Sequence, residues 1–132
     1  MNNPQPVRVR QVMTNRFQLV DGLMMVDQAI RLMKQSGAQV LIINKRNEND
    51  EYGMVLLSDI AREVLSTNRA PQRVNVYEVM SKPVVAVDPE MDIKYCARLF
   101  HQLGFNYAPV IDNGKVIGLV GYADLVLSGL VE

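Results

Sequence analysis

Few side chains in this sequence of 132 residues could do chemistry, and two aspartates are the most informative of them. Asp59 and Asp124 follow similar apolar segments, residues 53–55 and 118–120, and each stands where a helix is expected to begin. A carboxylate in a first helical turn is favourable because it faces the positive end of the helix dipole. It can also accept two hydrogen bonds from ligand hydroxyls, strengthened by its charge. The sequence leaves both interpretations open.

Histidine and cysteine each occur once, as His101 and Cys96, so no Ser-His-Asp or Cys-His set can be assembled convincingly. Cys96 lies on the apolar face of an expected helix, which indicates a small core residue and not a nucleophile. His101 has no companion ligands, so no metal site is expected. We therefore predict that the chain is not an enzyme and uses no cofactor.

The composition is that of a globular protein, with 48% hydrophobic and 21% charged residues. Lys plus Arg number 14 and Asp plus Glu number 14, and this balance disfavours a broad nucleic-acid-binding face. No apolar run approaches the roughly 20 residues that cross a bilayer, and residues 1–10 lack the apolar stretch of a signal peptide. We expect a cytoplasmic protein that binds neither membrane nor nucleic acid.

The sequence contains an internal repeat. A shift of 67 residues aligns positions 9–37 with 76–104 and gives ten identities, where ordinary composition gives about two. Beyond a loop the shift becomes 65, which pairs Asp59 with Asp124. The chain therefore consists of two related halves.

Each half predicts the same order of elements. A short strand (17–20 and 84–87) leads to a helix with a one-sided apolar stripe, formed by Val26, Ala29, Ile30 and Met33 or by Ile93, Cys96, Ala97 and Phe100. Asp92 is placed to cap the second helix, and Gly37 and Gly104 are placed to end the two helices.

A hairpin and a final helix complete each half. Strands 107–111 and 116–120 flank Asn113-Gly114, a favoured two-residue turn, whereas strands 40–43 and 52–57 flank a longer polar loop, 44–51. The final helices are expected to begin near Ser58-Asp59 and Ala123-Asp124, and residues 66–73 indicate a linker.

We predict an α+β fold in which two β-α-β-β-α repeats pack sheet to sheet about a pseudo-two-fold axis. A unit of about 60 residues buries too little surface to be stable comfortably alone, which favours one shared domain over residues 1–132. Its parts are repeat one (about 7–66), the linker (about 66–73) and repeat two (about 74–130). Such packing leaves two equivalent clefts between the copies.

The order of short motifs resembles a tandem pair of cystathionine-β-synthase (CBS) domains. In the second half the matching segments are Val79-Met80, Val87-Asp88-Pro89, Gly104, Ala108-Pro109-Val110-Ile111-Asp112, Gly118-Leu119-Val120 and Asp124-Leu125. The first half contributes Val12-Met13, Ala29, Gly37, Gly53-Met54-Val55 and Asp59-Ile60. The likeness runs from about residue 9 to residue 127.

The resemblance implies a sensor that binds AMP, ADP, ATP or S-adenosylmethionine between the copies, with Asp59 or Asp124 taking the ribose hydroxyls. The candidate ligand-binding residues are Asp124, Gly121, Tyr107, Ala108, Pro109, Lys82, Val84, Asp59 and Ser58. The hydroxyl residue that many relatives carry three positions before the aspartate is replaced here by Leu56 and Gly121. Gly121 still offers space and a backbone N–H, so the second cleft is the expected binding site.

Some of these residues also have a simpler interpretation that involves no ligand. Ala108-Pro109 is either a cleft wall or an edge-strand feature, and Lys82 and Arg16 either meet a phosphate or are solvated surface charges.

Two functions are compatible with the sequence. The first is a stand-alone regulatory module that binds an adenosyl ligand and signals to a partner protein. The alternative is a dimerisation or interaction module with vestigial clefts and no nucleotide ligand.

We also expect a homodimer, because apolar residues are expected to lie uncovered on the final helices. They are Ile60, Val64, Leu65, Leu125, Val126 and Leu127.

Overall fold

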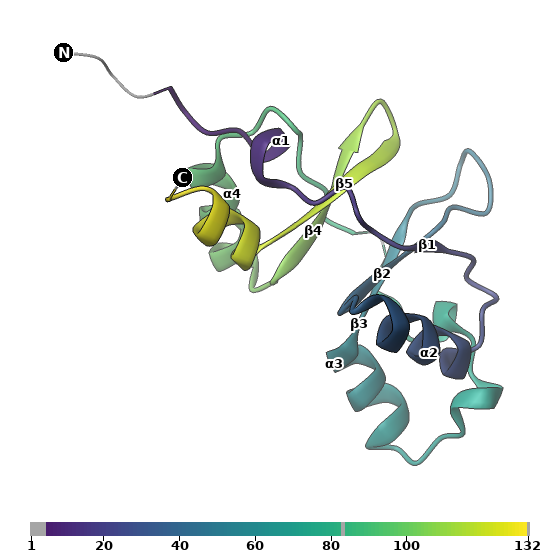
Figure 1. Cartoon of the computed structure of the whole chain (residues 1–132). Coiled ribbons are helices and arrows are strands. Elements are labelled where there is room, and N and C mark those ends of the chain that lie inside the picture. Colours follow the sequence, from purple (N-terminus) through teal and green to yellow (C-terminus); the bar gives the residue numbers. More distant parts are fainter. Residues whose placement is uncertain (1–4, 83, 132) are drawn as a thin grey trace. The chain divides into compact units, whose positions relative to one another are not determined.

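The chain forms two compact units, each with its own sheet and hydrophobic core (Figure 1). The structure is a computed structural model, and it describes residues 5–82 and 84–131. Residues 17–84 form one unit, here called the central unit. Residues 1–16 and 85–132 form the other, called the terminal unit.

The central unit is built on a three-stranded sheet in the order β1-β2-β3. Strands β1 (Leu19–Val20) and β2 (Val40–Ile43) are parallel, and β2 and β3 (Gly53–Leu56) are antiparallel. The helical elements of this unit are α2 (Val26–Ser36), which lies between β1 and β2, and four that come after β3. These four are α3 (Leu57–Ile60), the π-helix η1 (Ala61–Leu65) and the 3₁₀ turns η2 (Pro71–Arg73) and η3 (Val76–Glu78). The expected linker therefore contains one helical turn.

The terminal unit contains the antiparallel pair β4 (Tyr107–Asp112) and β5 (Lys115–Gly121). Its helices are α1 (Val9–Val12), α4 (Ile93–Leu103) and the π-helix η4 (Asp124–Ser128). The predicted hairpin turn is confirmed: Asn113 and Gly114 both have positive φ, 52° and 76°, as a two-residue turn between twisted strands requires.

Helices α2 and α4 confirm the predicted apolar stripes. Val26, Ala29 and Met33 are buried in α2, and Ile93, Cys96 and Phe100 are buried in α4, whereas Ile30 is 37% exposed. The Asp92 carboxylate accepts a hydrogen bond from the N–H of Lys94 (2.9 Å), so the predicted cap is present. Gly37 and Gly104 end the helices in the left-handed region, with φ of 75° and 73°.

The predicted strand 84–87 does not form, and only Val87 makes a single bridge to Val110. The reason lies in its partner strand. In the central unit the N–H of Ile42 donates to the Gln18 carbonyl (2.9 Å), but Pro109 occupies the matching position and has no N–H to donate. The parallel pairing of the second repeat is therefore shorter.

Each sheet is completed by a segment of the other repeat. Thr14, from the first repeat, exchanges two hydrogen bonds of 2.9 Å with Leu119 of β5. Ser81, from the second repeat, makes the matching pair with Met54 of β3 (2.9 and 3.0 Å). A unit thus combines the strands and helices of one repeat with the short entry segment of the other.

Two glycines make this exchange possible. A Cβ at Gly118 would lie 2.5 Å from the Met13 sulfur and 3.0 Å from the Thr14 carbonyl oxygen. A Cβ at Gly53 would lie 2.5 Å from the Met80 sulfur. Each glycine therefore lets the methionine of the incoming segment lie directly on the strand, and both methionines pack against a hydrophobic core.

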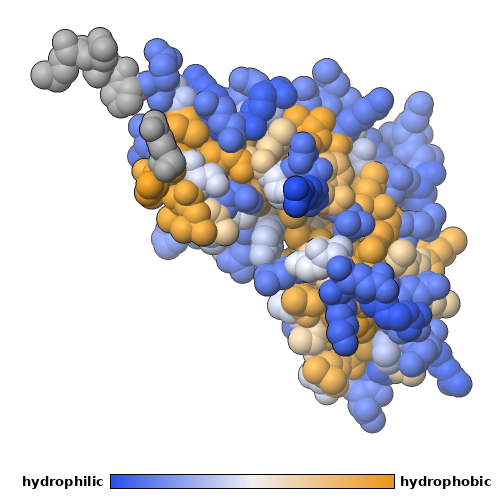
Figure 2. Space-filling model, in the orientation of Figure 1, coloured by the Kyte–Doolittle hydropathy of each residue, from blue (hydrophilic) through white to orange (hydrophobic). Residues whose placement is uncertain are grey.

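The apolar residues of the final helices divide into two groups. Ile60, Val64 and Leu125 are 7%, 3% and 3% exposed and belong to the cores, so the expectation that they lie on the surface is wrong. Leu65, Val126 and Leu127 are 78%, 47% and 72% exposed. Figure 2 shows an apolar patch over the C-terminal π-helix η4. None of the described helices is long and apolar enough to cross a membrane.

Cys96 is fully buried in the core of the terminal unit. Burial raises the pKa of its thiol to about 11, because a thiolate would be poorly solvated there. The side chain is therefore a packed apolar group, as the sequence predicted, and has none of the electropositive, accessible surroundings of a reactive cysteine.

The close approach at Gly118 gives a first prediction. Gly118→Ala is expected to lower the free energy of unfolding by about 1–3 kcal/mol, because the added methyl group meets backbone as well as the Met13 side chain. Gly53→Ala is the matched control and should cost less, since the nearest atom there is the mobile end of Met80. Urea unfolding of both variants measures the difference, and equal losses would contradict this explanation.

Candidate functional site

Asp124 lies on the first turn of the helix that follows β5. One carboxylate oxygen, Oδ2, accepts a hydrogen bond from the N–H of Gly121 at 2.8 Å and so caps its own helix. Burial raises the pKa of Asp124, and the hydrogen bond from Gly121 partly opposes that shift. Oδ1 has no hydrogen-bond or ion-pair partner among residues 5–82 and 84–131. One acceptor oxygen of this carboxylate is therefore available to a ligand.

Asp59 caps the matching helix of the central unit in the same way. Its Oδ2 accepts from the N–H of Leu56 at 2.8 Å. Its other oxygen, Oδ1, is 2.8 Å from a guanidinium nitrogen of Arg62, and this carboxylate is the main cause of the raised pKa of Arg62. Since Asp59 is only 6% exposed and both its oxygens have partners, it is less accessible to a ligand than Asp124.

Tyr107, Gly121 and Asp124 come together in the terminal unit. Tyr107 and Gly121 are paired residues of β4 and β5. A Cβ at Gly121 would lie 2.9 Å from two carbons of the Tyr107 ring, so the space expected for a phosphate there holds the ring. The Gly121 N–H expected for a phosphate donates to Asp124 instead. Gly121 is therefore a packing and capping position.

Ala108 and Pro109 are both buried, and Ala108 belongs to the core cluster of the terminal unit. The Pro109 carbonyl accepts a hydrogen bond from the N–H of Val87 (3.0 Å). Ala108 therefore has a structural role within the sheet and the core, and Pro109 has one within the sheet.

Ser58 is exposed and Val84 is half-buried, and both belong to the central unit. Lys82 does not lie near Asp59. Asp59 follows the Val40–Leu56 end of the β2-β3 pair, whereas Lys82 forms an ion pair with Asp50, in the loop at the Ile43–Gly53 end. Asp59 and Lys82, both candidate ligand-binding residues from the sequence, therefore lie at opposite ends of the β2-β3 pair.

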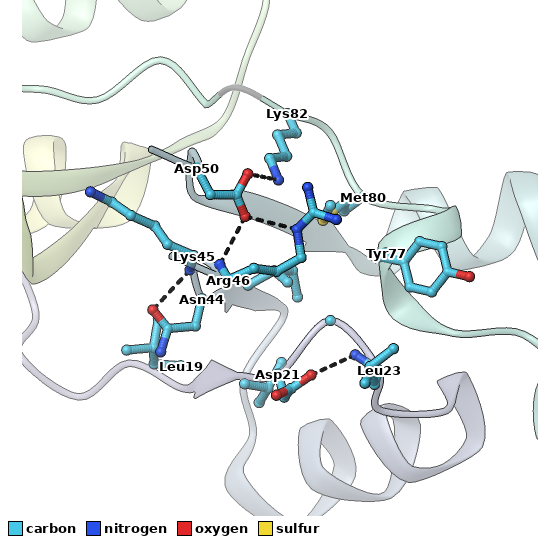
Figure 3. Close-up of a pocket in the computed structure, with 13 residues that line it drawn as sticks. Leu19, Asp21, Leu23, Asn44, Lys45, Arg46, Asp50, Tyr77, Met80 and Lys82 are labelled. Atoms are coloured by element: carbon cyan, nitrogen blue, oxygen red, sulfur yellow. Dashed lines mark hydrogen bonds and ion pairs between the residues drawn. The ribbon is translucent and has the colours of Figure 1, made fainter. Parts of the chain in front are cut away.

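A cavity of about 730 Å³ lies in the central unit around that ion pair (Figure 3). It opens where β1 and β2 end, and its charged lining comes from three segments of the chain, which contribute Asp21, residues 45–50 and Lys82. The lining residues are Leu19, Val20, Asp21, Gly22, Leu23, Ile43, Asn44, Lys45, Arg46, Asp50, Tyr77, Met80 and Lys82.

Asp50 organises the polar side of this cavity. Its side chain is 8% exposed and pairs with both Lys82 and Arg46, the latter through Nε at 3.2 Å and the backbone N–H at 2.8 Å. Figure 3 shows both cations converging on the carboxylate while the Lys45 ammonium points away. The hydrogen bond from Lys82, followed by that from the Arg46 backbone, holds the pKa of Asp50 well below its usual range.

Sequence reasoning identified Lys82 but missed Arg46, Asp50 and Tyr77. The available signal was the polar loop 44–51, which makes the first hairpin longer than the second and carries charges of both signs. From the sequence, this loop indicates only a difference in length between the two hairpins. Among the described residues, no group of three or more His, Cys, Asp and Glu side chains could hold a metal ion.

Comparison with known proteins shows the family to which the chain belongs. The family model described as "CBS domain" matches the chain twice, over residues 9–66 and 76–129. The chain belongs to the CBS domain family and carries two copies of the domain. The resemblance seen in the sequence is confirmed, and so is a mixed α/β fold matching that of CBS pairs.

Solved structures support the same fold. A hexameric CBS-CP12 protein from bloom-forming cyanobacteria is 34% identical, with a TM-score of 0.90 over 95% of this chain and 73% of that one. The CBS domain pair of protein MJ0100, in complex with 5′-methylthioadenosine and S-adenosylmethionine, has a TM-score of 0.78 over 94% of this chain and 98% of that chain. At 19% identity, that second likeness shows the fold alone.

Curated relatives include the CBS domain-containing protein YhcV of Bacillus subtilis, 27% identical over 91% of this chain and 84% of that protein. An uncharacterized protein of Methanopyrus kandleri is 28% identical over 76% of this chain. The chain spans about half the length of the first archaeal relatives, 51% and 54% of their sequences.

The environment of Asp50 predicts a pH dependence. Its folded-state pKa lies below the unfolded value of about 3.9, so the ionised side chain stabilises the fold above that pH and the contribution is lost as the pH falls through the folded-state pKa. Asp50→Asn is expected to be less stable than the parent at neutral pH, with a deficit that shrinks below about pH 4.

Urea unfolding over a series of pH values tests this. Glu48→Gln, which removes an exposed acid of the same loop, is the control and should show no such trend. A deficit for Asp50→Asn that stays constant with pH would contradict the assignment of the ion pairs.

Proposed function

We propose that this CBS pair is a regulatory module that binds an adenosine-containing compound through Asp124 and signals its presence to a partner protein. The observation that carries the proposal is the Oδ1 oxygen of the Asp124 carboxylate, to which none of the residues that the structure describes makes a hydrogen bond or ion pair. The fold can hold such compounds, since the CBS pair of MJ0100 is in complex with 5′-methylthioadenosine and S-adenosylmethionine. The proposed activity is binding and regulation, without catalysis.

The two repeats differ at the residue three positions after the aspartate. In the first repeat Arg62 pairs with Oδ1 of Asp59, whereas Leu127 stands at the matching position, and no cation among the described residues pairs with Asp124. A ribose diol can therefore donate to Asp124 without displacing an ion pair. The same diol would compete with a charge-assisted hydrogen bond at Asp59, so the second repeat is favoured.

The surroundings of Gly121 determine whether this residue can bind the phosphate groups of a nucleotide. Its N–H is engaged by Asp124, and the space above it is filled by Tyr107. A phosphate gains no hydrogen bond from this glycine. We therefore propose that recognition centres on the adenosine part, and we expect adenosine and S-adenosylmethionine to compete well with AMP, ADP and ATP.

Calorimetric titration with these compounds tests the proposal. Asp124→Ala is expected to weaken binding of the best of them about tenfold or more, because a charge-assisted hydrogen bond is lost. Asp124→Asn keeps an oxygen for the Gly121 N–H and should also weaken binding while preserving the helix cap. The matched variants Asp59→Ala and Asp59→Asn should change binding less.

Circular dichroism of each variant separates loss of binding from loss of folding. If the Asp59 variants lose binding and the Asp124 variants do not, the wrong repeat has been chosen. If the parent protein binds none of the compounds at millimolar concentration, the sensor function is wrong.

A second candidate function, a dimerisation or interaction module without a nucleotide, is favoured by one observation. Exposed apolar residues gather at the end of the terminal unit, where Leu127, Leu130 and Val131 are 72%, 73% and 71% exposed. Contiguous apolar surface of this kind is typical of interfaces. We propose that it joins two copies of the chain, whether or not a ligand is bound.

Light scattering during size-exclusion chromatography tests the homodimer. The parent is expected to elute with at least twice its 14.9 kDa mass, and the double variant Leu127→Lys, Leu130→Lys should elute as a monomer. Leu23→Lys, at a 71% exposed position of the central unit, is the control. A parent of monomer mass at tens of micromolar, or a lysine variant of unchanged mass, would contradict this interface.

A further inference from the structure

The cavity of the central unit has the size of a small-molecule site. Its volume of about 730 Å³ falls within the roughly 300–1,000 Å³ typical of ligand pockets. It lies at the Ile43–Gly53 end of the β2-β3 pair, whereas Asp59 follows the opposite end. It is therefore distinct from the Asp59 position of the central unit and from Asp124, which belongs to the terminal unit.

Near Asp50 the hydrogen-bonding groups that no described residue uses are N–H donors, whereas at Asp21 the Oδ2 oxygen is an unused acceptor. Both oxygens of Asp50 are engaged by Arg46 and Lys82, and Asp21 accepts from the N–H of Leu23 at 2.7 Å. An ammonium has three N–H donors and a guanidinium five, yet Lys82 makes one contact, and Arg46 uses one side-chain nitrogen, among the residues the structure describes. The group that these side chains can still bind is an anion.

The remaining lining is apolar and open to solvent. Leu19, Leu23 and Tyr77 are 43%, 71% and 49% exposed, although all three line the cavity. Figure 3 places the Tyr77 ring and Leu23 on the side of the cavity away from Lys82. Exposed apolar and aromatic side chains facing a hollow favour a ligand with an apolar or aromatic body.

We propose that this cavity binds a small organic anion, with its apolar ring against Tyr77 and Leu23 and its phosphate or carboxylate held by Arg46 and Lys82. The anion accepts from the N–H groups of Arg46 and Lys82 that Asp50 leaves unused. The strongly lowered pKa of Asp50 is consistent with this, because it shows how favourably the same two residues stabilise a negative charge. The proposal does not rest on the adenosyl function of Asp124.

The lining of the cavity includes residues close in sequence to both ends of the central unit. Leu19 lies two residues after Phe17, where the chain enters the central unit, and Lys82 lies two residues before Val84, where the chain leaves it. A ligand held by Lys82 therefore binds close to the point where the chain leaves the central unit.

Two-dimensional NMR of the full chain, titrated with phenyl phosphate, tests the proposal. The amide signals of Arg46, Asp50, Tyr77 and Val84 should shift together. Inorganic phosphate lacks the aromatic ring and benzyl alcohol lacks the phosphate. Each should therefore bind at least about tenfold more weakly than phenyl phosphate. Lys82→Gln and Arg46→Gln should each weaken phenyl phosphate binding about tenfold.

Lys115→Gln, an exposed lysine of the terminal unit, is the matched control and should bind like the parent. Asp124→Ala should also bind like the parent, which separates this site from the adenosyl site. The proposal is overturned if the shifts map to other residues or if both glutamine variants bind as the parent does. It is also overturned if inorganic phosphate binds as tightly as phenyl phosphate.

Discussion

The structure depends on an exchange of short segments between the two repeats. Met13 lies on Gly118, and Met80 lies on Gly53, so that each sheet is extended by the entry segment of the other repeat. The exchange partly buries both methionines against a core and satisfies backbone groups at Leu119 and Met54 that would otherwise face solvent at a sheet edge. Neither repeat can complete its own unit, and this constraint makes two short repeats one protein.

Much of the fold could be predicted because the sequence repeats itself. The stripes on α2 and α4, the glycines that end these helices and the Asn113-Gly114 turn are local signals, and all are confirmed. Non-local effects could not be predicted. The strand at 84–87 is lost because Pro109 lacks an N–H, and Ile60, Val64 and Leu125 are buried by tertiary packing.

The candidate sites also combine local features that could be predicted from the sequence with non-local ones that could not. Periodicity and the repeat located Asp59 and Asp124, but only the folded structure shows that both cap their own helices and that Arg62 pairs with one of them. The cavity around Asp50 depends on a loop, on η3 and on Lys82, which are distant in sequence and joined only by folding. Ion pairs between such segments leave no pattern in a single sequence.

The central claim is that the Oδ1 oxygen of Asp124 is the ligand contact of this CBS pair. A crystal structure of the protein grown with S-adenosylmethionine or AMP tests it most directly. The account predicts a ribose hydroxyl within about 3 Å of that oxygen, with the Gly121 hydrogen bond retained. A ligand bound with its ribose on Asp59, or with no contact to Asp124, would contradict it.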